Sequence, residues 1–417
     1  AARATGVSRA RSRARTFTPG TYPGRGEGAI PLRNGRVAAA METHPITIRT
    51  ITPEEFGAWE QVLGSAFGFD PRPEESEIWK ARAEWDRYLG AFSGEEMVGT
   101  GGALTFTMAV PGGNALPLGG VTAIATRPTH RRRGVLTAIM RRLLEDARER
   151  GEAISALWAA ESIIYGRFGY GVAIEGCEMS LDRAHAAFTD RRPPEGRLRQ
   201  LGEAEAKEII PQVYARAIAG VPGSMTRRPA DWNLYFYDPE HWREGSTAHR
   251  YVLYERGGEA AGYVVYRQKE VWEQGLARNE LRVGDLQAVD GEAFRALWGY
   301  CLAIDLVASI KAWNRPLRDP LALLLADPRR LQQTRSDQIW LRFVDVAAAL
   351  AARRYAAEGD LVLEVSDGFL PWAGGRFLLR GGPDGAECAR TDREPDLRIP
   401  SADLASAYLG DARLRDL

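Results

Sequence analysis

The chain has 417 residues, of which 45% are apolar and 26% charged, a balance typical of a globular protein with two or three domains. Residues 1–40 hold eight arginines and one glutamate, which leaves 47 of the 55 basic and 54 of the 55 acidic side chains for the rest. This mildly acidic remainder argues against a nucleic-acid binder and fits a cationic small substrate. No apolar run is long enough to span a membrane, and three scattered cysteines and five unpaired histidines predict neither disulfides nor a metal site.

The first 45 residues are rich in Arg, Ser, Gly and Ala and lack the apolar core of a signal peptide. We interpret them as a disordered basic tail or a non-native extension, and Met41 is the candidate native start. A transit peptide is the alternative that the composition leaves open. Because nothing indicates export, we expect a cytoplasmic protein.

From residue 46 the chain alternates short strands and helices, which is typical of a mixed sheet covered by helices. Thr52-Pro53-Glu54-Glu55 combines an N-cap residue, a proline and a glutamate as at a helix start. For a first unit over residues 46–190 we expect strands at 46–49, 88–92, 96–110, 115–126, 154–158 and 172–181, and helices from 52 and at 73–87, 129–150 and 161–168.

A linker at 191–196 leads into a second unit over residues 197–338, whose element order echoes the first. Its expected elements are helix 203–219, strands 251–256, 262–269 and 279–288, helix 291–305 and strand 306–312. A third unit over residues 339–417 has the order of a small α+β domain: a strand from Ile339, helix 346–354, strands 360–366, 375–380 and 386–390, and a closing segment 401–409. The predicted fold class is therefore α/β with mixed sheets.

The most informative stretch is Ala123–Thr137, where a strand leads into a basic, glycine-containing loop that opens a helix. The unpaired N–H groups and the dipole of a helix N-terminus favour anions, and Gly134 lets the backbone approach a phosphate closely. Arg131–Arg133 add forked donors, and cations at a helix start are unfavourable unless an anion binds there. We therefore prefer a phosphate site over a solvated arginine surface.

This Arg-Arg-x-Gly loop resembles the pyrophosphate loop of the GNAT N-acetyltransferases, which use acetyl-CoA, although its last small position is Leu136 or Thr137 here. From residue 46 to the end, further stretches are similar in order to the Eis-like (enhanced intracellular survival) subfamily: 128–134, Ile-Tyr-Gly-Arg-Phe-Gly-Tyr-Gly at 164–171, 339–342, 362–368 and 408–410. The resemblance implies tandem GNAT folds, the second of them degenerate, followed by a sterol-carrier-like domain, in a homohexamer.

The resemblance also implies the site residues. Tyr165 matches the family's general acid, and a phenol with a pKa of about 10 can protonate or hydrogen-bond a departing CoA thiolate. Tyr170, beside two glycines, is expected only to pack. Acetyl-CoA would contact the strand before the loop, the loop itself and a pair near the thioester: Ile124, Ala125, Thr126, Arg132, Arg133, Gly134, Val135, Leu136, Thr137, Ala160 and Glu161.

The general base of the family is the terminal carboxylate, on a segment beyond Tyr408-Leu409-Gly410. Residues 411–417 resemble the first turns of a helix, so we expect the third unit to be truncated and assign no base role to Leu417. Glu161, acting through water, is a conceivable substitute. In the second unit the helix from Gly291 starts between Asp290 and Glu292, which would repel phosphate, so we expect that unit not to bind CoA.

For the amine substrate, Phe67, Phe69 and Trp79 are candidates to line the cleft, and Asp337 matches an acidic substrate position of the family. Ordinary packing or a surface charge explains each of them equally well. An acidic, aromatic pocket suits a polyamine, an aminoglycoside-like amine or a lysine side chain, and the sequence does not choose among them. We expect direct attack of the amine on acetyl-CoA in a ternary complex, without a metal ion.

Two other classes of function stay open. A lipid or sterol carrier would need an apolar tunnel in the third unit, for which the candidates are Leu361, Leu363, Val365, Phe369 and Leu370, although these are more simply a core. A non-catalytic CoA-binding regulatory protein would keep the arginine loop and dispense with Tyr165. The presence of Tyr165 favours the enzyme.

Overall fold

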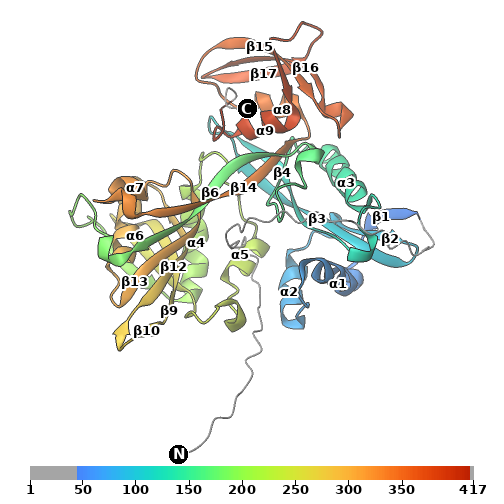
Figure 1. Cartoon of the computed structure of the whole chain (residues 1–417). Helices are drawn as coiled ribbons and strands as arrows, with labels where there is room; N and C mark the ends of the chain where they lie inside the picture. Colours follow the sequence, from blue (N-terminus) through green and yellow to red (C-terminus); the bar gives the residue numbers. More distant parts are fainter. Residues whose placement is uncertain (1–44, 414–417) are drawn as a thin grey trace, which may run out of the picture.

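The computed structural model describes residues 45–413, so almost all of the expected tail at 1–45 lies outside the described residues. One twelve-stranded mixed sheet runs through the first two units (Figure 1). Its strands, in spatial order, are β1 (Ile46–Thr50), β2 (Tyr88–Ser93), β3 (Glu96–Ala109), β4 (Ala115–Thr126), β5 (Ile154–Leu157), β14 (Gln332–Phe343), β6 (Gly171–Asp182), β13 (Val307–Pro316), β12 (Asn279–Ala288), β9 (Glu259–Lys269), β8 (Arg250–Arg256) and β7 (Arg197–Leu201).

Helices cover both faces of the first unit's part of this sheet. Leu104 of β3 packs in a core with α1 (Phe56–Phe67), and the neighbouring Ala103 packs in another with α3 (Val135–Glu149). Because successive side chains of a strand point to opposite faces, α1 and α3 lie on opposite faces. The helix α2 (Pro73–Arg82) follows α1 and contacts α5 (Pro229–Phe236) of the second unit.

The second unit repeats this layering. The helix α4 (Glu203–Ala217) packs on β9 and β12 in one core, and α6 (Gly291–Ala303) packs on the same strands in another. The short helix α7 (Leu321–Leu324) contacts α6, and β10 (Trp272–Glu273) and β11 (Leu276–Ala277) form a separate hairpin.

The third unit has its own four-stranded sheet. The strands, in spatial order, are β17 (Gly385–Arg390), β16 (Gly375–Gly382), β15 (Gly359–Ser366) and β18 (Leu397–Pro400), and the helices are α8 (Val346–Ala351) and α9 (Ser401–Tyr408). Apolar residues of this unit share a core with Leu118, Ile154 and Ala156 of the first unit. Figure 1 shows α9 directly over β6 and β14, which it contacts. The third unit is therefore packed onto the first.

Several expected helices have different bounds in the structure. The helix expected from residue 129 begins at Val135, because Pro128–His130 forms a short 3-10 turn and both Arg132 and Gly134 have positive φ. The helix expected over 161–168 is a turn that ends in the 3-10 segment Gly166–Phe168, bounded by glycines. Helix α2 ends at Arg82 instead of residue 87, and the strands β7, β10, β11 and β18 and the helices α5 and α7 were not expected.

The strand that contains Ile339 was grouped with the third unit, but it does not join that unit's sheet. That strand, β14, pairs with β5 from Phe343 to Trp340 and with β6 over most of its length. It completes the large sheet between the first two units. The reason is non-local: the mostly buried second half of β14, from Gln338 to Phe343, pairs with β5 and β6, which lie far away in sequence.

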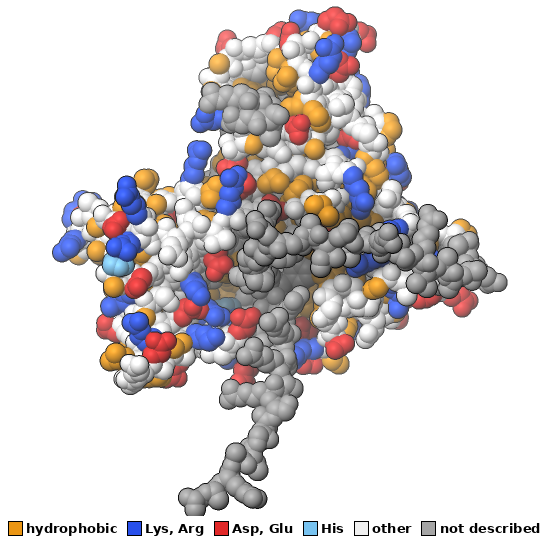
Figure 2. Space-filling model, viewed as in Figure 1, with side chains coloured by type: hydrophobic (Ala, Val, Ile, Leu, Met, Phe, Trp, Pro, Cys, Tyr) orange, Lys and Arg blue, Asp and Glu red, His pale blue; other side chains and the backbone are white. Residues whose placement is uncertain are grey.

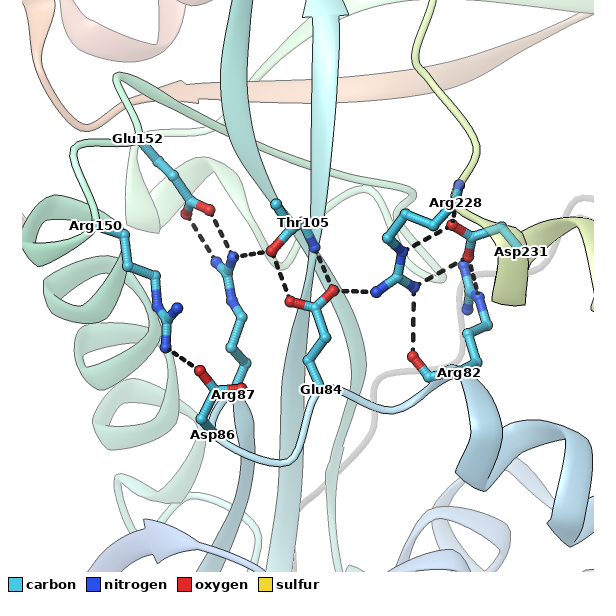
Figure 3. Close-up of polar contacts among 9 residues, drawn as sticks. All are labelled: Arg82, Glu84, Asp86, Arg87, Thr105, Arg150, Glu152, Arg228 and Asp231. Atoms are coloured by element: carbon cyan, nitrogen blue, oxygen red, sulfur yellow. Dashed lines mark hydrogen bonds and ion pairs between the residues drawn. The ribbon is translucent and has the colours of Figure 1, made fainter.

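A chain of polar contacts joins the first two units (Figure 3). Arg87 and Glu152 form a buried bidentate pair, with 2.5 Å from Nη1 to Oε1 and 2.7 Å from Nη2 to Oε2. Arg87 Nη1 also donates to the Thr105 hydroxyl at 2.9 Å. Glu84 accepts from the Thr105 amide at 2.7 Å and pairs with Arg228 at the start of α5. Arg82, the last residue of α2, pairs with Asp231 of α5 at 2.7 Å, so the network also holds the end of α2 against the second unit.

Candidate active site

The parallel pair β4 and β5 opens at its carboxyl end. Their register runs from Leu118 opposite Ile154 to Val121 opposite Leu157, where β5 ends, while β4 continues to Thr126. Beyond Val121 no described strand pairs with β4 on the β5 side. On the other side β3 still pairs with Ala125 and Thr126, after a bulge at Ala123. The predicted contact residues Ile124, Ala125 and Thr126 therefore lie on an open strand edge, which can hydrogen-bond an extended ligand.

The loop after β4 ends at a helix start that has no side-chain cap. Gly134, the N-cap residue of α3, has φ of 82°, and no atom lies within 4 Å of where its Cβ would be. The residues Arg131 to Gly134 are exposed, and Val135 is buried as an anchor of α3. Thr137 is exposed and Leu136 is half-buried. Exposed arginines and the free N–H groups of the first helical turn thus lie together, in the arrangement that binds phosphate.

Tyr165 lies in the turn after β5 and is 7% exposed. Its ring is in the same core as Leu157 and Trp340 and meets the ring of Tyr170 edge-on, with 6.0 Å between centroids. Burial raises the pKa of Tyr165 to about 12, and the Glu161 carboxylate acts in the same direction. The phenol is therefore protonated at neutral pH and able to donate a proton.

Tyr170 has the packing role that the sequence indicates. The Ser155 hydroxyl donates to the Gly119 carbonyl at 3.0 Å, so the Tyr170 hydroxyl, 2.8 Å from Ser155 Oγ, is the donor to Ser155. Tyr170 is 1% exposed, and burial raises its pKa. This chain of hydrogen bonds ties the turn to β5 and β4, next to the open strand edge.

Ala160 and Glu161 are exposed in the segment between β5 and Tyr165. Their neighbour Trp158 was not among the expected site residues; it was expected to end the strand 154–158, but it follows β5 directly and is 42% exposed. Its ring stacks on that of Trp313 from β13, with 6.4 Å between centroids and 12° between planes. An exposed tryptophan after a fully buried strand is the local signal, but only the fold shows that its partner comes from the second unit.

The expected substrate residues come from two places. Phe67 and Trp79 are half-buried on α1 and α2, where Trp79 packs in the core that also contacts Ala123 at the β4 bulge. Phe69 is 39% exposed. Asp337 lies on β14, three residues before Trp340, which pairs with the last residue of β5, and it accepts a hydrogen bond from Trp340 Nε1 at 2.5 Å. Asp337 is thus near the open end of β5, whereas Phe67 and Trp79 are on the helical side.

The second unit has a similar parallel pair, β12 and β13, but its opening is filled. The pair ends at Val283 opposite Ala312, and the Arg315 side chain then donates to the Leu286 carbonyl of β12 at 3.1 Å. The carboxylate of Asp319 neutralises this arginine, with 2.8 Å between Asp319 Oδ2 and Arg315 Nη2. The start of α6 is also occupied, because Asp290 Oδ1 accepts from the Ala293 amide at 2.8 Å. Both features support the expectation that the second unit does not take CoA.

Within residues 45–413, no group of three His, Cys, Asp or Glu side chains is placed to hold a metal ion. In the same range no helix is both long and apolar enough to cross a bilayer. Basic and acidic side chains are interspersed on the face in Figure 2 rather than gathered by sign. A cleft of about 700 Å³ lies in the second unit, between α4, α5 and β8, and contains none of the predicted site residues.

Family models match the three units in order. Residues 47–173 and 223–344 each match an acetyltransferase (GNAT) domain, and residues 346–417 match a sterol carrier protein domain. The expected fold class, two GNAT folds followed by a sterol-carrier-like domain, is confirmed. The division at residues 190, 197 and 339 is not tested by these matches and stays a prediction.

Relatives and solved structures cover nearly the whole chain. An uncharacterized N-acetyltransferase of Streptomyces avermitilis is 40% identical over 374 residues, which are 89% of this chain and 91% of that protein. N-acetyltransferase Eis of Mycobacterium bovis is 33% identical over 387 residues, with the same coverage. The crystal structure of Eis1 from Mycobacterium abscessus superposes with a TM-score of 0.78 at 36% identity, covering 89% of this chain and 91% of that one. With its open β4 edge, uncapped α3 and buried Tyr165, the chain belongs to the Eis-like N-acetyltransferases of the GNAT superfamily and is an acyltransferase.

Proposed function

We propose that this enzyme transfers the acetyl group of acetyl-CoA to a primary amine by direct attack in a ternary complex. One observation carries the proposal: the open edge of β4 leads from the uncapped start of α3 to the turn that holds Tyr165. The pyrophosphate would bind at the start of α3, and the pantetheine would extend along Ile124, Ala125 and Thr126. The thioester would then reach Ala160 and Tyr165.

In this mechanism the amine nitrogen attacks the thioester carbonyl, and the C–S bond of the tetrahedral intermediate breaks. The leaving thiolate takes the Tyr165 proton, and the proton of the amine passes to water or to a base. Because burial keeps the Tyr165 phenol protonated, it is ready to donate throughout the neutral range. The amine is the substrate class implied by the family; its identity as a polyamine, an aminoglycoside-like amine or a lysine is left to experiment. A cytoplasmic location and a homohexamer stay predictions from the resemblance.

The lipid-carrier alternative receives less support. Leu363 and Val365 are 2% exposed and pack in the core shared with β5, and Phe369 and Leu370 pack in the core that holds Tyr165. Four of the five candidate tunnel residues are thus buried against the first unit, and Leu361 packs at the edge of the same core. A regulatory role without catalysis has no feature of its own in its favour.

The test is acetylation of an amine panel with acetyl-CoA, followed by mass spectrometry, for the wild type and Tyr165→Phe. We expect Tyr165→Phe to lower kcat by about 10²-fold and to leave acetyl-CoA affinity unchanged, because only the proton donor is removed. Tyr355→Phe is the matched control, since this tyrosine donates only to the Leu350 carbonyl in the third unit. Equal kcat for the wild type and Tyr165→Phe would contradict the acid role of Tyr165. If no amine of the panel is acetylated, the proposed function itself is wrong.

The pH profile gives an independent check. The amine becomes neutral as the pH rises, so kcat/KM should increase from pH 7. A Tyr165 pKa of about 12 means that the acid is not lost over this range, so no descending limb should appear up to pH 10. A fall in kcat/KM between pH 8 and pH 10 in the wild type, absent from Tyr165→Phe, would contradict the raised pKa.

A further inference from the structure

A buried ion pair connects the third unit to the sheet of the first two. Arg342 on β14 is fully buried, and Asp367, which follows β15, is equally inaccessible. Arg342 Nη2 donates to Asp367 Oδ2 at 2.8 Å. Among the described residues the Nε and Nη1 atoms of Arg342 have no hydrogen-bond partner. Within residues 45–413, the carboxylate of Asp367 is therefore the acidic group that pairs with this buried charge.

The guanidinium of Arg342 lies directly against the turn that carries Tyr165. A Cβ atom on Gly169 would lie 1.6 Å from Arg342 Nη1, so this position accepts no side chain, and its φ of 80° also requires glycine. Gly169 ends the short helix that Tyr165 begins. Both Phe168 and Tyr170 donate their amides to the Tyr165 carbonyl, at 2.9 and 3.3 Å. Arg342 thus sets the position of the backbone that holds Tyr165.

The partner carboxylate supports the same turn from a second direction. Asp367 Oδ1 accepts from the amides of Phe369 and Leu370 at 3.0 and 2.7 Å. The Phe369 ring meets the Phe168 ring edge-on, with 5.0 Å between centroids, and the guanidinium of Arg141 in α3 lies 4.7 Å from the centre of the Phe369 ring. One carboxylate therefore orders the segment that packs against both the turn and the helix of the predicted CoA loop.

We propose that Arg342 and Asp367 are positioning residues for Tyr165, through which the sterol-carrier-like unit holds the acid turn of the acetyltransferase in place. Arg342 contacts the turn at Gly169. Asp367 supports the turn indirectly, because it holds Phe369, whose ring packs against Phe168. This inference rests on the proposed function, in which Tyr165 is the acid. The third unit is then a working part of the catalytic site rather than an independent carrier.

The first experiment compares Asp367→Asn with Asp319→Asn in the full chain. Each aspartate pairs with a buried arginine, and its carboxylate accepts one backbone amide in Asp319 and two in Asp367, but Asp319 and its partner Arg315 lie in the second unit. We expect Asp367→Asn to lower kcat by about 10-fold or more, because small misplacements of a catalytic group are costly, with unchanged affinity for acetyl-CoA and unchanged amine KM. Asp319→Asn should keep the wild-type kcat, although both variants lose thermal stability.

The decisive measurement repeats the substitution in the Tyr165→Phe background. If Asp367 acts through the phenol, Asp367→Asn should change kcat less than two-fold once the phenol is absent. An equal loss of kcat with and without the phenol, or no loss in the wild-type background, would overturn the positioning role. If Tyr165→Phe alone keeps the full kcat, Tyr165 is not the acid and the positioning role is overturned as well. If the wild type transfers no acetyl group, the proposed function itself is overturned.

A second variant keeps the test valid if Asp367→Asn does not fold. Gly169→Ala introduces a methyl group against Arg342 Nη1 and should lower kcat in the same way, again only when the phenol is present. Gly151→Ala is the control, because Gly151 has φ of 71° but no atom lies within 4 Å of its Cβ position. Equal kcat for the two variants would show that the contact with Arg342 does not position the turn.

Discussion

Two helix starts in similar places have opposite properties. In the first unit the N-cap residue of α3 is Gly134, without a side-chain cap and beside exposed arginines, next to an open strand edge. In the second unit α6 begins at Asp290, whose carboxylate accepts the Ala293 amide and pairs with Arg256, and Arg315 fills the opening beside it. The same position in the fold can therefore be a ligand site or have a purely structural role. The outcome depends on whether side chains of the protein hydrogen-bond the N–H groups at the helix start.

The same contrast holds for the charged groups. Arg131 and Arg132 of the first unit are exposed, whereas Asp238 of the second unit is surrounded by Arg243, Arg267 and the His249 amide. Charge changes in the loop before α3 should therefore act on binding, and charge changes around Asp238 should act on stability.

The largest expected effect is on acetyl-CoA binding. Arg132→Glu should lower the affinity about 10³-fold, because a charge-assisted contact is replaced by repulsion of the pyrophosphate. Isothermal calorimetry measures this directly. The matched change beside α6, Arg256→Glu, should leave the affinity within two-fold, and equal affinities for the two variants would break the comparison.

The next effect is on stability in acid. Burial, followed by the charge of Arg267, lowers the pKa of His249 to about 4, whereas an unfolded histidine titrates near 6.5. Below pH 6.5 the unfolded chain binds more protons here, so the stabilisation by neutral His249 is fully present above pH 6.5 and is lost progressively as the pH falls from 6.5 to about 4. His249→Gln should reduce the acid-induced loss of unfolding free energy by about 2 kcal/mol.

Urea unfolding at pH 7 and pH 4.5 measures this difference. His185→Gln is the control, since His185 is exposed on the surface. The same loss on acidification in His249→Gln as in the wild type would mean that another group of the second unit carries the effect. Acetyl-CoA affinity at pH 7 should not change in either variant.

The smallest effect tests whether the cap of α6 has only a structural role. Asp290→Ala should cost about 1 kcal/mol of stability, as for other N-cap aspartates, without any change in acetyl-CoA affinity. Because Arg315 still fills the strand opening, calorimetry should show one acetyl-CoA site per chain before and after the change. A second binding step in Asp290→Ala would show that the aspartate alone keeps the second unit closed.

The sequence by itself determined most of the strands and helices, the basic loop before α3 and the family. These features depend on local patterns: apolar periodicity, turn residues and the motifs around Arg132 and Tyr165. The predicted start of α3 was six residues too early. A 3-10 turn at Pro128–His130 and positive φ at Arg132 and Gly134 interrupt an otherwise helical pattern. That interruption is what exposes the predicted phosphate loop.

Only the tertiary structure decided how distant segments meet. The strand with Ile339 completes the large sheet, Trp158 stacks on Trp313, and the Arg315 side chain fills the second unit's opening. Each contact joins residues far apart in sequence or different strands of one sheet, so no local period or motif encodes it. The same is true of Arg342 under Gly169: its buried charge is neutralised by Asp367 of the third unit, and that pair forms only once the chain is folded.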